Sequence, residues 1–333
     1  MASQRFLIIQ TAFLGDAILA TGLLEKLHAF FPDAKIDMLI RKGNESIFNN
    51  HPYLNELLIW DKKPKKWKNL FRILGKIRAV KYDKVINVQR FFSTGLITAF
   101  SGAKETIGFD KNPLQFLFTK KIKHEIGITD QHLHETQRNH RLISAFTDNN
   151  PAKPVLYPLK IDIEVVQKFK SAPYITISPA SVWFTKQFPA AQWIELINNL
   201  HGSLQVYLMG SPDDRETAEH IKNTSGKKNI TNLCGEIGIL QAAALMQDAK
   251  MNYVNDSAPL HIASSVNAPV AAVFCSTIPA FGFTPLSDKS IVIETSSQLS
   301  CRPCGLHGKK ACPEGHFNCA KTITTDQLLS VLN

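Results

Sequence analysis

The sequence predicts an α/β protein built from two Rossmann-like domains, whose parallel sheets face a cleft. Along the 333 residues, short apolar runs typical of buried strands alternate with segments of helical periodicity. A stretch with three prolines, DNNPAKPVLYP at residues 148–158, interrupts this alternation near the middle of the chain. We therefore expect an N-terminal domain over residues 1–150 and a C-terminal domain over residues 151–333.

The N-terminal half opens with a strand, a turn and a helix. Phe6 to Ile9 form a short apolar run, and apolar residues recur at helical spacing from Ala17 to Phe31, just before Pro32. Similar patterns predict strands at residues 36–40, 54–60 and 84–88 and helices at residues 65–80 and 94–101. Such alternation is typical of a parallel sheet covered by helices.

The same alternation resumes after the proline-rich stretch. The expected strands are residues 174–177, 204–209, 251–254 and 270–274, and the expected helices are residues 190–201, 212–223, 239–249 and 260–265. This order predicts a second domain of the same class as the first.

The composition is that of a soluble globular protein. Apolar residues make up 44% of the chain and charged residues 20%. No apolar run approaches the roughly 20 residues that span a bilayer. Residues 1–20 include Asp16 and lack a small-residue cleavage site, so we expect no secretory signal and a cytoplasmic protein.

The positive charge is concentrated in the first half. Residues 1–150 hold 23 Lys and Arg against 14 Asp and Glu, which is +9 of the formal net charge of +10. This asymmetry predicts an anionic partner for the first half, such as nucleic acid, a membrane surface or a phosphorylated substrate. The alternative is a solvated basic face that keeps the protein soluble.

Two loops of the second half combine features of a phosphate site. Both follow predicted strands, where open parallel sheets bind ligands. The loop at residues 178–189 offers hydroxyls, backbone N–H groups and Lys186, which suit a diphosphate. The loop at residues 209–214 contains Gly210, which permits a tight turn, and carboxylates that can accept hydrogen bonds from ribose hydroxyls.

A third loop, residues 255–261, places Asp256 and Ser257 at a helix start and His261 about one turn later. Each feature has a plainer alternative. Asp256 and Ser257 could simply cap the helix, Lys186 could be an ordinary surface lysine, and His261 a packed histidine. Three such loops after three strands together favour a nucleotide-diphosphate pocket.

Eight stretches also resemble one family in their order and spacing. They are LGDAILATGLLEKLHAFFP, HPYLNELLIWDK, YDKVINVQ, SGAKETIGF, HETQRN, SPASVWFTKQFP, NDSAPLHIA and VFCSTIPAFGFTP. With them the sequence resembles the lipopolysaccharide heptosyltransferases, glycosyltransferases of family 9 with a GT-B fold, over nearly the whole chain. The resemblance implies an acceptor site in the first domain and an NDP-sugar donor site in the second. It implies inverting transfer of a heptose from ADP-heptose to the lipopolysaccharide inner core, with no metal required.

The resemblance also implies roles for individual residues. Asp16 falls where the family has its proposed general base, and Lys186 matches the lysine that contacts the donor diphosphate. The other residues that it places in the donor site are Ser181 in the Lys186 loop, Gly210, Asp214 near an acidic residue that contacts the ribose, and the D-[ST]-x-x-x-H residues Asp256, Ser257 and His261, with Ala258 where glycine is more common. The last difference and Ala180, in a loop where the family has glycine, leave the family resemblance intact but do not specify the sugar or the acceptor.

This resemblance suggests a purpose for Asp16, which follows a strand and a turn that lack the G-x-G-x-x-G phosphate pattern. An inverting transfer needs a base to take a proton from the acceptor hydroxyl, and a carboxylate after the first strand can do so. We expect Gly15 to allow the tight turn that presents it. The alternative is that Asp16 only caps the helix.

The segment at residues 62–84 combines many lysines with Trp67 and Phe71. Its apolar stripe, Trp67, Leu70, Phe71, Leu74 and Ile77, predicts packing on the sheet, which leaves the lysines in water. The same segment could lie against anionic lipid. We expect packing together with weak, salt-sensitive attraction to the inner membrane surface.

Four of the six cysteines lie in a tail at residues 301–319: Cys301, Cys304, Cys312 and Cys319. With His307 and His316 they offer six candidate ligands for a structural zinc ion, which needs four. The spacing after the C-x-x-C pair is not that of a standard finger, so free thiols that help to order a loop are the alternative. We expect Cys234 and Cys275 to be small core residues.

Other functions remain open on the sequence alone. One is a GT-B transferase that uses another NDP-sugar, and a second is a GT-B protein that binds a nucleotide-sugar without transferring it. A third, of a different class, is a basic nucleic-acid-binding protein with a zinc-ribbon-like tail. It leaves Asp16, Lys186 and the 255–261 loop unexplained, so we expect no nucleic-acid partner.

Overall fold

The computed structural model describes residues 3–126, 133–200 and 203–332, which divide into two compact units, residues 1–157 and 158–333. The division follows seven residues after the expected boundary at residue 150. The reason is that the connecting segment is tied to unit 1. The Val155 N–H donates a hydrogen bond to Thr21 Oγ1 (3.0 Å), and the Tyr157 hydroxyl donates to both carboxylate oxygens of Glu25 (2.9 and 3.0 Å).

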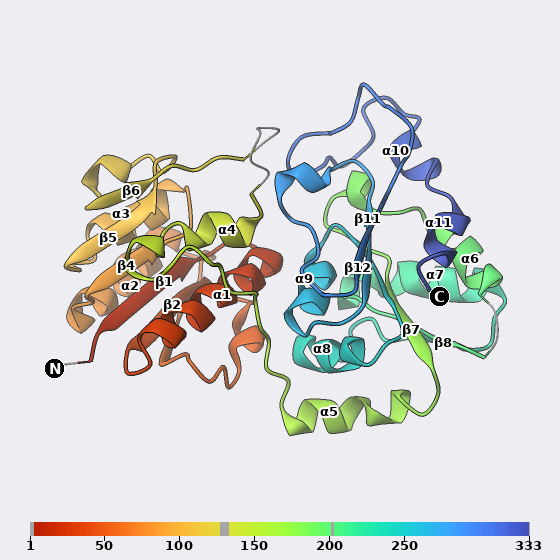
Figure 1. The fold of residues 1–333 in the computed structure, drawn as a ribbon, viewed down its shortest axis with the longest axis horizontal. Coiled ribbons are helices and arrows are strands. Elements are labelled where there is room, and N and C mark those ends of the chain that lie inside the picture. Colours follow the sequence, from red (N-terminus) through yellow and green to blue (C-terminus); the bar gives the residue numbers. More distant parts are fainter. Residues whose placement is uncertain (1–2, 127–132, 201–202, 333) are drawn as a thin grey trace. The chain divides into compact units, whose positions relative to one another are not determined.

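Unit 1 contains a six-stranded parallel sheet in the order β3-β2-β1-β4-β5-β6 (Figure 1). Its strands are β1 (Arg5–Gln10), β2 (Lys35–Arg41), β3 (Glu56–Trp60), β4 (Lys84–Asn87), β5 (Glu105–Phe109) and β6 (Lys120–Ile122). Its helices are α1 (Leu14–Phe30), α2 (Lys66–Val80), α3 (Phe92–Ala99) and α4 (Glu135–His140). This order places the switch in chain direction between β1 and β4, as in a doubly wound Rossmann sheet.

Unit 2 repeats this plan, with a parallel sheet in the order β12-β11-β10-β7-β8-β9. Its strands are β7 (Tyr174–Ser178), β8 (Gln205–Leu208), β9 (Ile230–Asn232), β10 (Asn252–Asn255), β11 (Val270–Phe274) and β12 (Ser290–Glu294). Its helices are α5 (Lys160–Val166), α6 (Ala190–Asn199), α7 (Arg215–Ser225), α8 (Ile239–Gln247), α9 (Ala258–Ser265), α10 (Asn318–Lys321) and α11 (Thr325–Leu329). The switch point here lies between β7 and β10.

Each strand or helix expected from the sequence has a counterpart, with ends displaced by a few residues. The helix expected from residue 17 begins at Leu14, and the helix expected from residue 212 begins with a 3₁₀ turn, Pro212–Asp214. The strands β5, β6, β9 and β12 were not expected. β6 has only three residues, of which Lys120 and Lys121 are exposed, so it lacks the apolar run on which the other predictions rest.

Helix α2 corrects one expectation about packing. Its buried residues are Leu70, Ile73, Leu74 and Ile77, which belong to or adjoin the core of unit 1. Trp67 and Phe71, expected on that same buried side, are 48% and 58% exposed. Both lie one turn apart at the border of the apolar stripe, so α2 packs with its aliphatic residues and presents two aromatic rings to solvent.

The core of each unit lies between its sheet and the helices that cover it. In unit 2 it includes Trp193 and Tyr253, and Cys234 and Cys275 are fully buried in it, as expected. Within the described ranges, no helix combines the length and the apolarity that a membrane span would need.

Candidate active site

The polar loops of unit 2 follow the strands at its switch point. The loop that contains Lys186 follows β7, and Asp256 directly follows β10, the strand beside β7. The turn with Gly210 follows β8, on the other side of β7. The carboxyl ends of parallel strands meet at one edge of the sheet, so the structure gathers these three loops where such folds bind ligands.

Lys186 and Asp256 form an ion pair at this edge. The Lys186 Nζ lies 2.7 Å from Asp256 Oδ2, and the two side chains are only 15% and 8% exposed. The hydroxyl of Thr277, in the loop after β11, donates a 2.6 Å hydrogen bond to the same Asp256 oxygen. Asp256 thus holds the lysine ammonium in a fixed place, where it can meet a phosphate.

Asn255, the last residue of β10, fixes the Lys186 loop from beneath. Its Nδ2 donates to the carbonyl oxygen of Pro179 (2.8 Å), and its Oδ1 accepts from the N–H of Phe188 (2.9 Å). One buried amide therefore clamps both ends of the loop. Sequence reasoning named Asp256 and Ser257 but missed Asn255, whose only signal is its position at the end of a buried strand.

The residues after Asp256 begin helix α9. Ser257 is at the N-cap position of α9, yet its side chain makes no capping hydrogen bond. Its hydroxyl is instead 3.4 Å from the carbonyl oxygen of Asn255. Ala258 begins the helix, and His261 is buried one turn later, with its ring centroid 6.5 Å from that of Phe283. The capping alternative therefore does not account for Asp256 and Ser257.

Asp214 closes the turn that begins at Gly210. Its Oδ2 accepts hydrogen bonds from the N–H (2.8 Å) and the hydroxyl (2.7 Å) of Ser211. A Cβ on Gly210 would lie 2.9 Å from Asp214, so glycine is required for this close approach. In the Lys186 loop, Ser181 is half-buried, and its carbonyl oxygen accepts a 2.6 Å hydrogen bond from Gln187.

In unit 1, Asp16 lies in the first turn of α1, the helix that follows β1. The N-cap of this helix is Phe13, so Asp16 is not the capping residue. The positive end of the helix dipole favours the ionised carboxylate there. Gly15 also lies inside the helix and has no positive φ, so the tight turn expected of it is not what places Asp16.

A buried ion pair lies close to Asp16. Helix α4 packs against α1, and in it Arg138 Nε lies 2.8 Å from Glu135 Oε2. Burial raises the pKa of Glu135, the charge of Arg138 opposes that rise, and the charge of Asp16 adds to it. The carboxyl groups of Asp16 and Glu135 therefore interact electrostatically. Sequence reasoning quoted HETQRN but gave these residues no role; the signal was a run of polar residues that the fold buries.

The cysteine-rich tail lines a cavity of about 330 Å³ in unit 2. Its lining includes all four tail cysteines and His316, and Cys301 Sγ lies 4.0 Å from His316 Nε2. Burial raises the pKa of Cys319 to about 11, so its thiol is protonated at neutral pH. In the parts of the chain that the structure describes, no three His, Cys, Asp or Glu side chains are arranged to hold a metal ion. Zinc therefore stays a prediction from spacing.

Comparison with known proteins assigns the chain to a family. The model of glycosyltransferase family 9 (heptosyltransferase) matches residues 70–316, which is most of the chain. The chain belongs to this family. It is therefore a glycosyltransferase, as the resemblance implied.

The family 9 enzyme is similar to named heptosyltransferases over most of its length. It is 28% identical over 306 residues to lipopolysaccharide heptosyltransferase 3 of Escherichia coli, covering 84% of this chain and 85% of the relative. Its fold matches that of ADP-heptose lps heptosyltransferase II of E. coli, with a TM-score of 0.78, 22% identity and coverage of 99% and 98%. It also matches E. coli heptosyltransferase WaaC with ADP-2-deoxy-2-fluoro heptose, with a TM-score of 0.74, 16% identity and coverage of 98% of both chains. These matches confirm the GT-B fold.

Proposed function

We propose that this enzyme transfers a heptose from ADP-heptose to a hydroxyl of the lipopolysaccharide inner core, with inversion at the anomeric carbon. The observation that carries the proposal is the ion pair of Lys186 and Asp256 at the switch point of unit 2. Membership of the heptosyltransferase family and the relatives' names support heptose as the sugar. A WaaC structure that contains an ADP-heptose analogue supports ADP as its carrier.

On the donor side, Lys186 provides the charge that the reaction needs. When the bond between the anomeric carbon and the diphosphate oxygen breaks, its electron pair stays on that oxygen. Negative charge therefore grows on the departing ADP. An ammonium held in place by Asp256 stabilises that charge without having to reorganise. The neighbouring donor-site residues, in our proposal, are Ser181, Gly210, Asp214, Ser257, Ala258 and His261.

On the acceptor side, Asp16 is the proposed general base. The acceptor hydroxyl oxygen attacks the anomeric carbon from the face opposite ADP, and its proton passes to the Asp16 carboxylate. The buried ion pair of Glu135 and Arg138 lies on α4, which packs against the helix that carries Asp16. No step of this scheme needs a metal ion, and a zinc ion in the tail would be structural.

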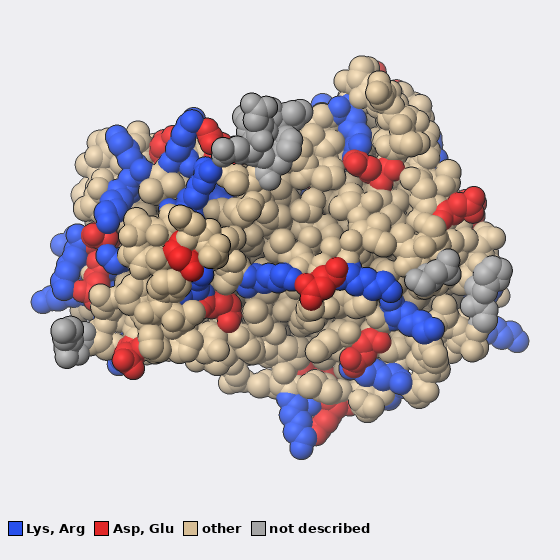
Figure 2. Space-filling view, viewed as in Figure 1, with Lys and Arg blue, Asp and Glu red and all other residues tan. Residues whose placement is uncertain are grey.

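Exposed rings and cations of unit 1 support an anionic, lipid-linked acceptor in this proposal. Exposed aromatic rings follow its strands at the carboxyl edge, with Phe13 after β1 and Phe91 after β4, which are 64% and 60% exposed. Of the cations at the same edge, Arg41 ends β2 and Lys62 follows β3. On the face drawn in Figure 2, Lys and Arg side chains also gather over β5 and β6 of this unit. We therefore infer a cytoplasmic enzyme that binds the inner membrane surface peripherally and weakly.

Calorimetric titration of the purified enzyme with ADP, UDP, GDP and CDP tests the donor. We expect selective binding of ADP, and its loss in Lys186→Ala. Preference for another nucleotide would replace ADP-heptose by a different NDP-sugar within the same fold. A short DNA duplex serves as the control for the basic charge, and salt-sensitive DNA binding without a nucleotide response would overturn the proposal.

A further inference from the structure

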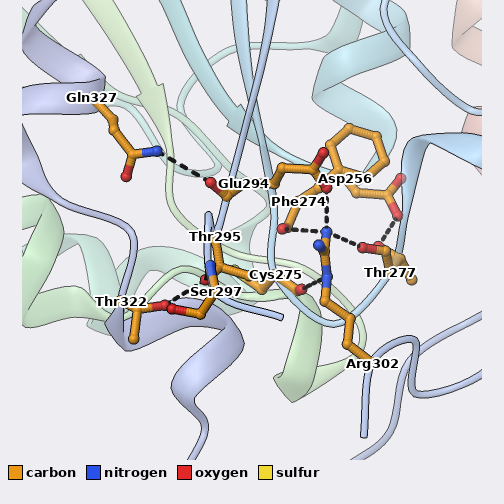
Figure 3. Close-up of polar contacts among 10 residues, drawn as sticks. All are labelled: Asp256, Phe274, Cys275, Thr277, Glu294, Thr295, Ser297, Arg302, Thr322 and Gln327. Carbon is orange, nitrogen blue, oxygen red and sulfur yellow. Dashed lines mark hydrogen bonds and ion pairs between the residues drawn. The ribbon is translucent and has the colours of Figure 1, made fainter. Parts of the chain in front are cut away.

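Arg302, in the cysteine-rich tail, reaches into the loop that follows β11 (Figure 3). Its Nε donates to the carbonyl oxygen of Cys275 (2.8 Å), and its Nη2 to those of Phe274 (3.1 Å) and Thr277 (2.7 Å). The same Nη2 lies 2.6 Å from Glu294 Oε2, at the end of β12. One guanidinium thus binds the carbonyl oxygens of Phe274, Cys275 and Thr277 at the carboxyl edge of the sheet.

Loss of the Arg302 hydrogen bonds should destabilise the loop, because the guanidinium and its carbonyl partners are buried. The Arg302 side chain is only 12% exposed, and Phe274, Cys275 and Thr277 are buried. Carbonyl groups in such surroundings need donors, and a guanidinium offers five in a rigid fork. Glu294 offsets its charge, so the cation can stay in place without solvent.

The loop that Arg302 holds also carries the partner of Asp256. Thr277 directs its carbonyl toward Arg302 and its hydroxyl to Asp256 Oδ2, as Figure 3 shows. Asp256 in turn holds Lys186. A displacement of Thr277 therefore removes one of the two hydrogen-bonding partners that orient the Asp256 oxygen facing the lysine.

A second contact of the tail lies next to Lys186, at Thr185. The Lys309 N–H donates to Thr185 Oγ1 (2.7 Å), and the Thr185 N–H donates to the carbonyl oxygen of Lys309 (3.1 Å). Thr185 Oγ1 also accepts from the hydroxyl of Ser276 (2.9 Å). The residues that precede Lys186 and Thr277 are thus joined to each other and to the tail.

We propose that Arg302 is a positioning residue of the donor site: it fixes the loop of Thr277 and, through Asp256, the place of Lys186. The inference rests on the proposed function only for what the ordered lysine meets, the diphosphate of the donor. It gives the tail a part in the reaction whether or not its cysteines bind a metal. Arg302 itself makes no contact with the donor in this scheme.

The test compares Arg302→Met and Arg302→Lys with a matched control, Lys170→Met. Lys170 is also a buried cation of unit 2, 10% exposed, that donates to the carbonyl oxygen of Ala244 (2.9 Å) and pairs with Asp248 (2.5 Å). It follows α5, which packs on α8, and it has no part in the donor loops. Two readouts are needed: the dissociation constant of ADP, and hydrogen–deuterium exchange of residues 184–187 and 274–278 without nucleotide.

We expect Arg302→Met to weaken ADP binding by about tenfold and to speed exchange in both segments, since carbonyls are left without donors. Arg302→Lys should restore part of both, because one ammonium can still reach one or two of the carbonyls. Lys170→Met should lower thermal stability and change neither readout. If Arg302→Met does not fold, Arg302→Lys carries the same comparison at smaller amplitude.

The two readouts separate this inference from the proposed function. Unchanged ADP affinity and unchanged exchange in a folded Arg302 variant would overturn the positioning role. If the wild-type enzyme binds no ADP, the donor assignment fails, and faster exchange at residues 184–187 and 274–278 in Arg302→Met still supports the positioning role. Equal effects in Lys170→Met would reduce Arg302 to a general contributor to stability and so overturn it.

Discussion

The Nζ of Lys186 and the Oδ2 of Asp256 are 2.7 Å apart, although 70 residues separate them in the chain, and both side chains are largely buried. They come from the ends of two neighbouring strands, β7 and β10, that flank the switch point of unit 2. An ammonium has three N–H donors, and one of them meets Asp256, so this lysine can also bind an anionic ligand. This pair makes the proposed donor site testable by substitution.

Substitution of Lys186 should impair both donor binding and transfer. We expect Lys186→Ala to lower kcat/KM by about 10²-fold or more, because the charge that offsets the departing diphosphate is lost. Lys186→Arg keeps the positive charge but replaces a compact ammonium by a planar guanidinium, so we expect an intermediate rate. Lys160→Ala, which removes an exposed lysine paired with Glu164, is the control and should behave as the wild type. An active Lys186→Ala variant would remove Lys186 from the mechanism.

Asp16→Asn should separate chemistry from donor binding. The amide cannot accept the acceptor proton, so we expect the transfer rate to fall by about 10²–10⁴-fold. ADP affinity, measured by calorimetry, should stay within about twofold, because Asp16 and the donor loops belong to different units. Transfer at the wild-type rate would show that another group is the base, and Glu135, the buried carboxylate that senses Asp16, would be the first to examine.

These residues also show how far the sequence alone could go. Lys186, Asp256 and Asp16 lie in short stretches with recognisable spacing, after strands that are clear from their apolar runs. Their partners could not be found in this way. Thr277 and Arg302 act over 21 and 25 residues through contacts that only the folded sheet creates.

The fold itself was predictable where periodicity was strong and not where it was weak. Alternating strands and helices indicated two doubly wound sheets, and the structure has them. The three-residue strands β6 and β9 carry too few side chains for a pattern. On α2, spacing placed Trp67 on the buried side, but the ring lies at the border of the apolar stripe and is 48% exposed.

The pH dependence of acceptor binding should reveal the titration of Lys62. Burial, and secondarily the charges of Arg41 and Lys66, lower the pKa of Lys62 to about 8 from its usual 10.5. Its ammonium donates to the carbonyl oxygen of Thr11 (2.7 Å), beside the turn that leads to Asp16. As the pH rises through about 8 the lysine loses its charge, so we expect the KM for an anionic acceptor to increase there. The KM for the donor should not follow.

Lys62→Arg supplies the control for this effect. Arginine stays charged throughout the range, so the increase in acceptor KM near pH 8 should disappear in this variant. An increase that persists in Lys62→Arg would assign the titration to another group. Initial rates at several acceptor concentrations between pH 6.5 and 9.5 are sufficient for both enzymes.

A chelator should leave transfer unchanged. The positive charge at the proposed donor site comes from Lys186, and no described group of three His, Cys, Asp or Glu residues is arranged to hold a metal. We therefore expect the same kcat before and after treatment with EDTA. Elemental analysis of the untreated enzyme decides the separate question of zinc in the tail: one zinc per chain, with a lower unfolding temperature after chelation, would identify a structural ion. Loss of kcat that added metal restores would contradict a metal-free reaction.

Membrane attraction should depend on Trp67 and Phe71 as well as on charge. Both rings are exposed on α2, beside the cations Lys66, Lys68 and Arg72. We expect sedimentation with vesicles that contain anionic lipid, weakening as salt rises, because the charge contribution is screened within a Debye length of about 10 Å at 0.1 M.

The double variant Trp67→Ser, Phe71→Ser tests the aromatic part of this attraction. It should bind the same vesicles several-fold more weakly at low salt, since two interfacial rings are lost while the cations remain. The matched control is Ile161→Ser, Ile163→Ser on α5, which removes two exposed apolar side chains, 59% and 42% exposed, from unit 2. Equal losses in both double variants would mean that general surface apolarity, and not α2, draws the enzyme to lipid. Binding that is indifferent to salt would contradict the electrostatic part of the proposal.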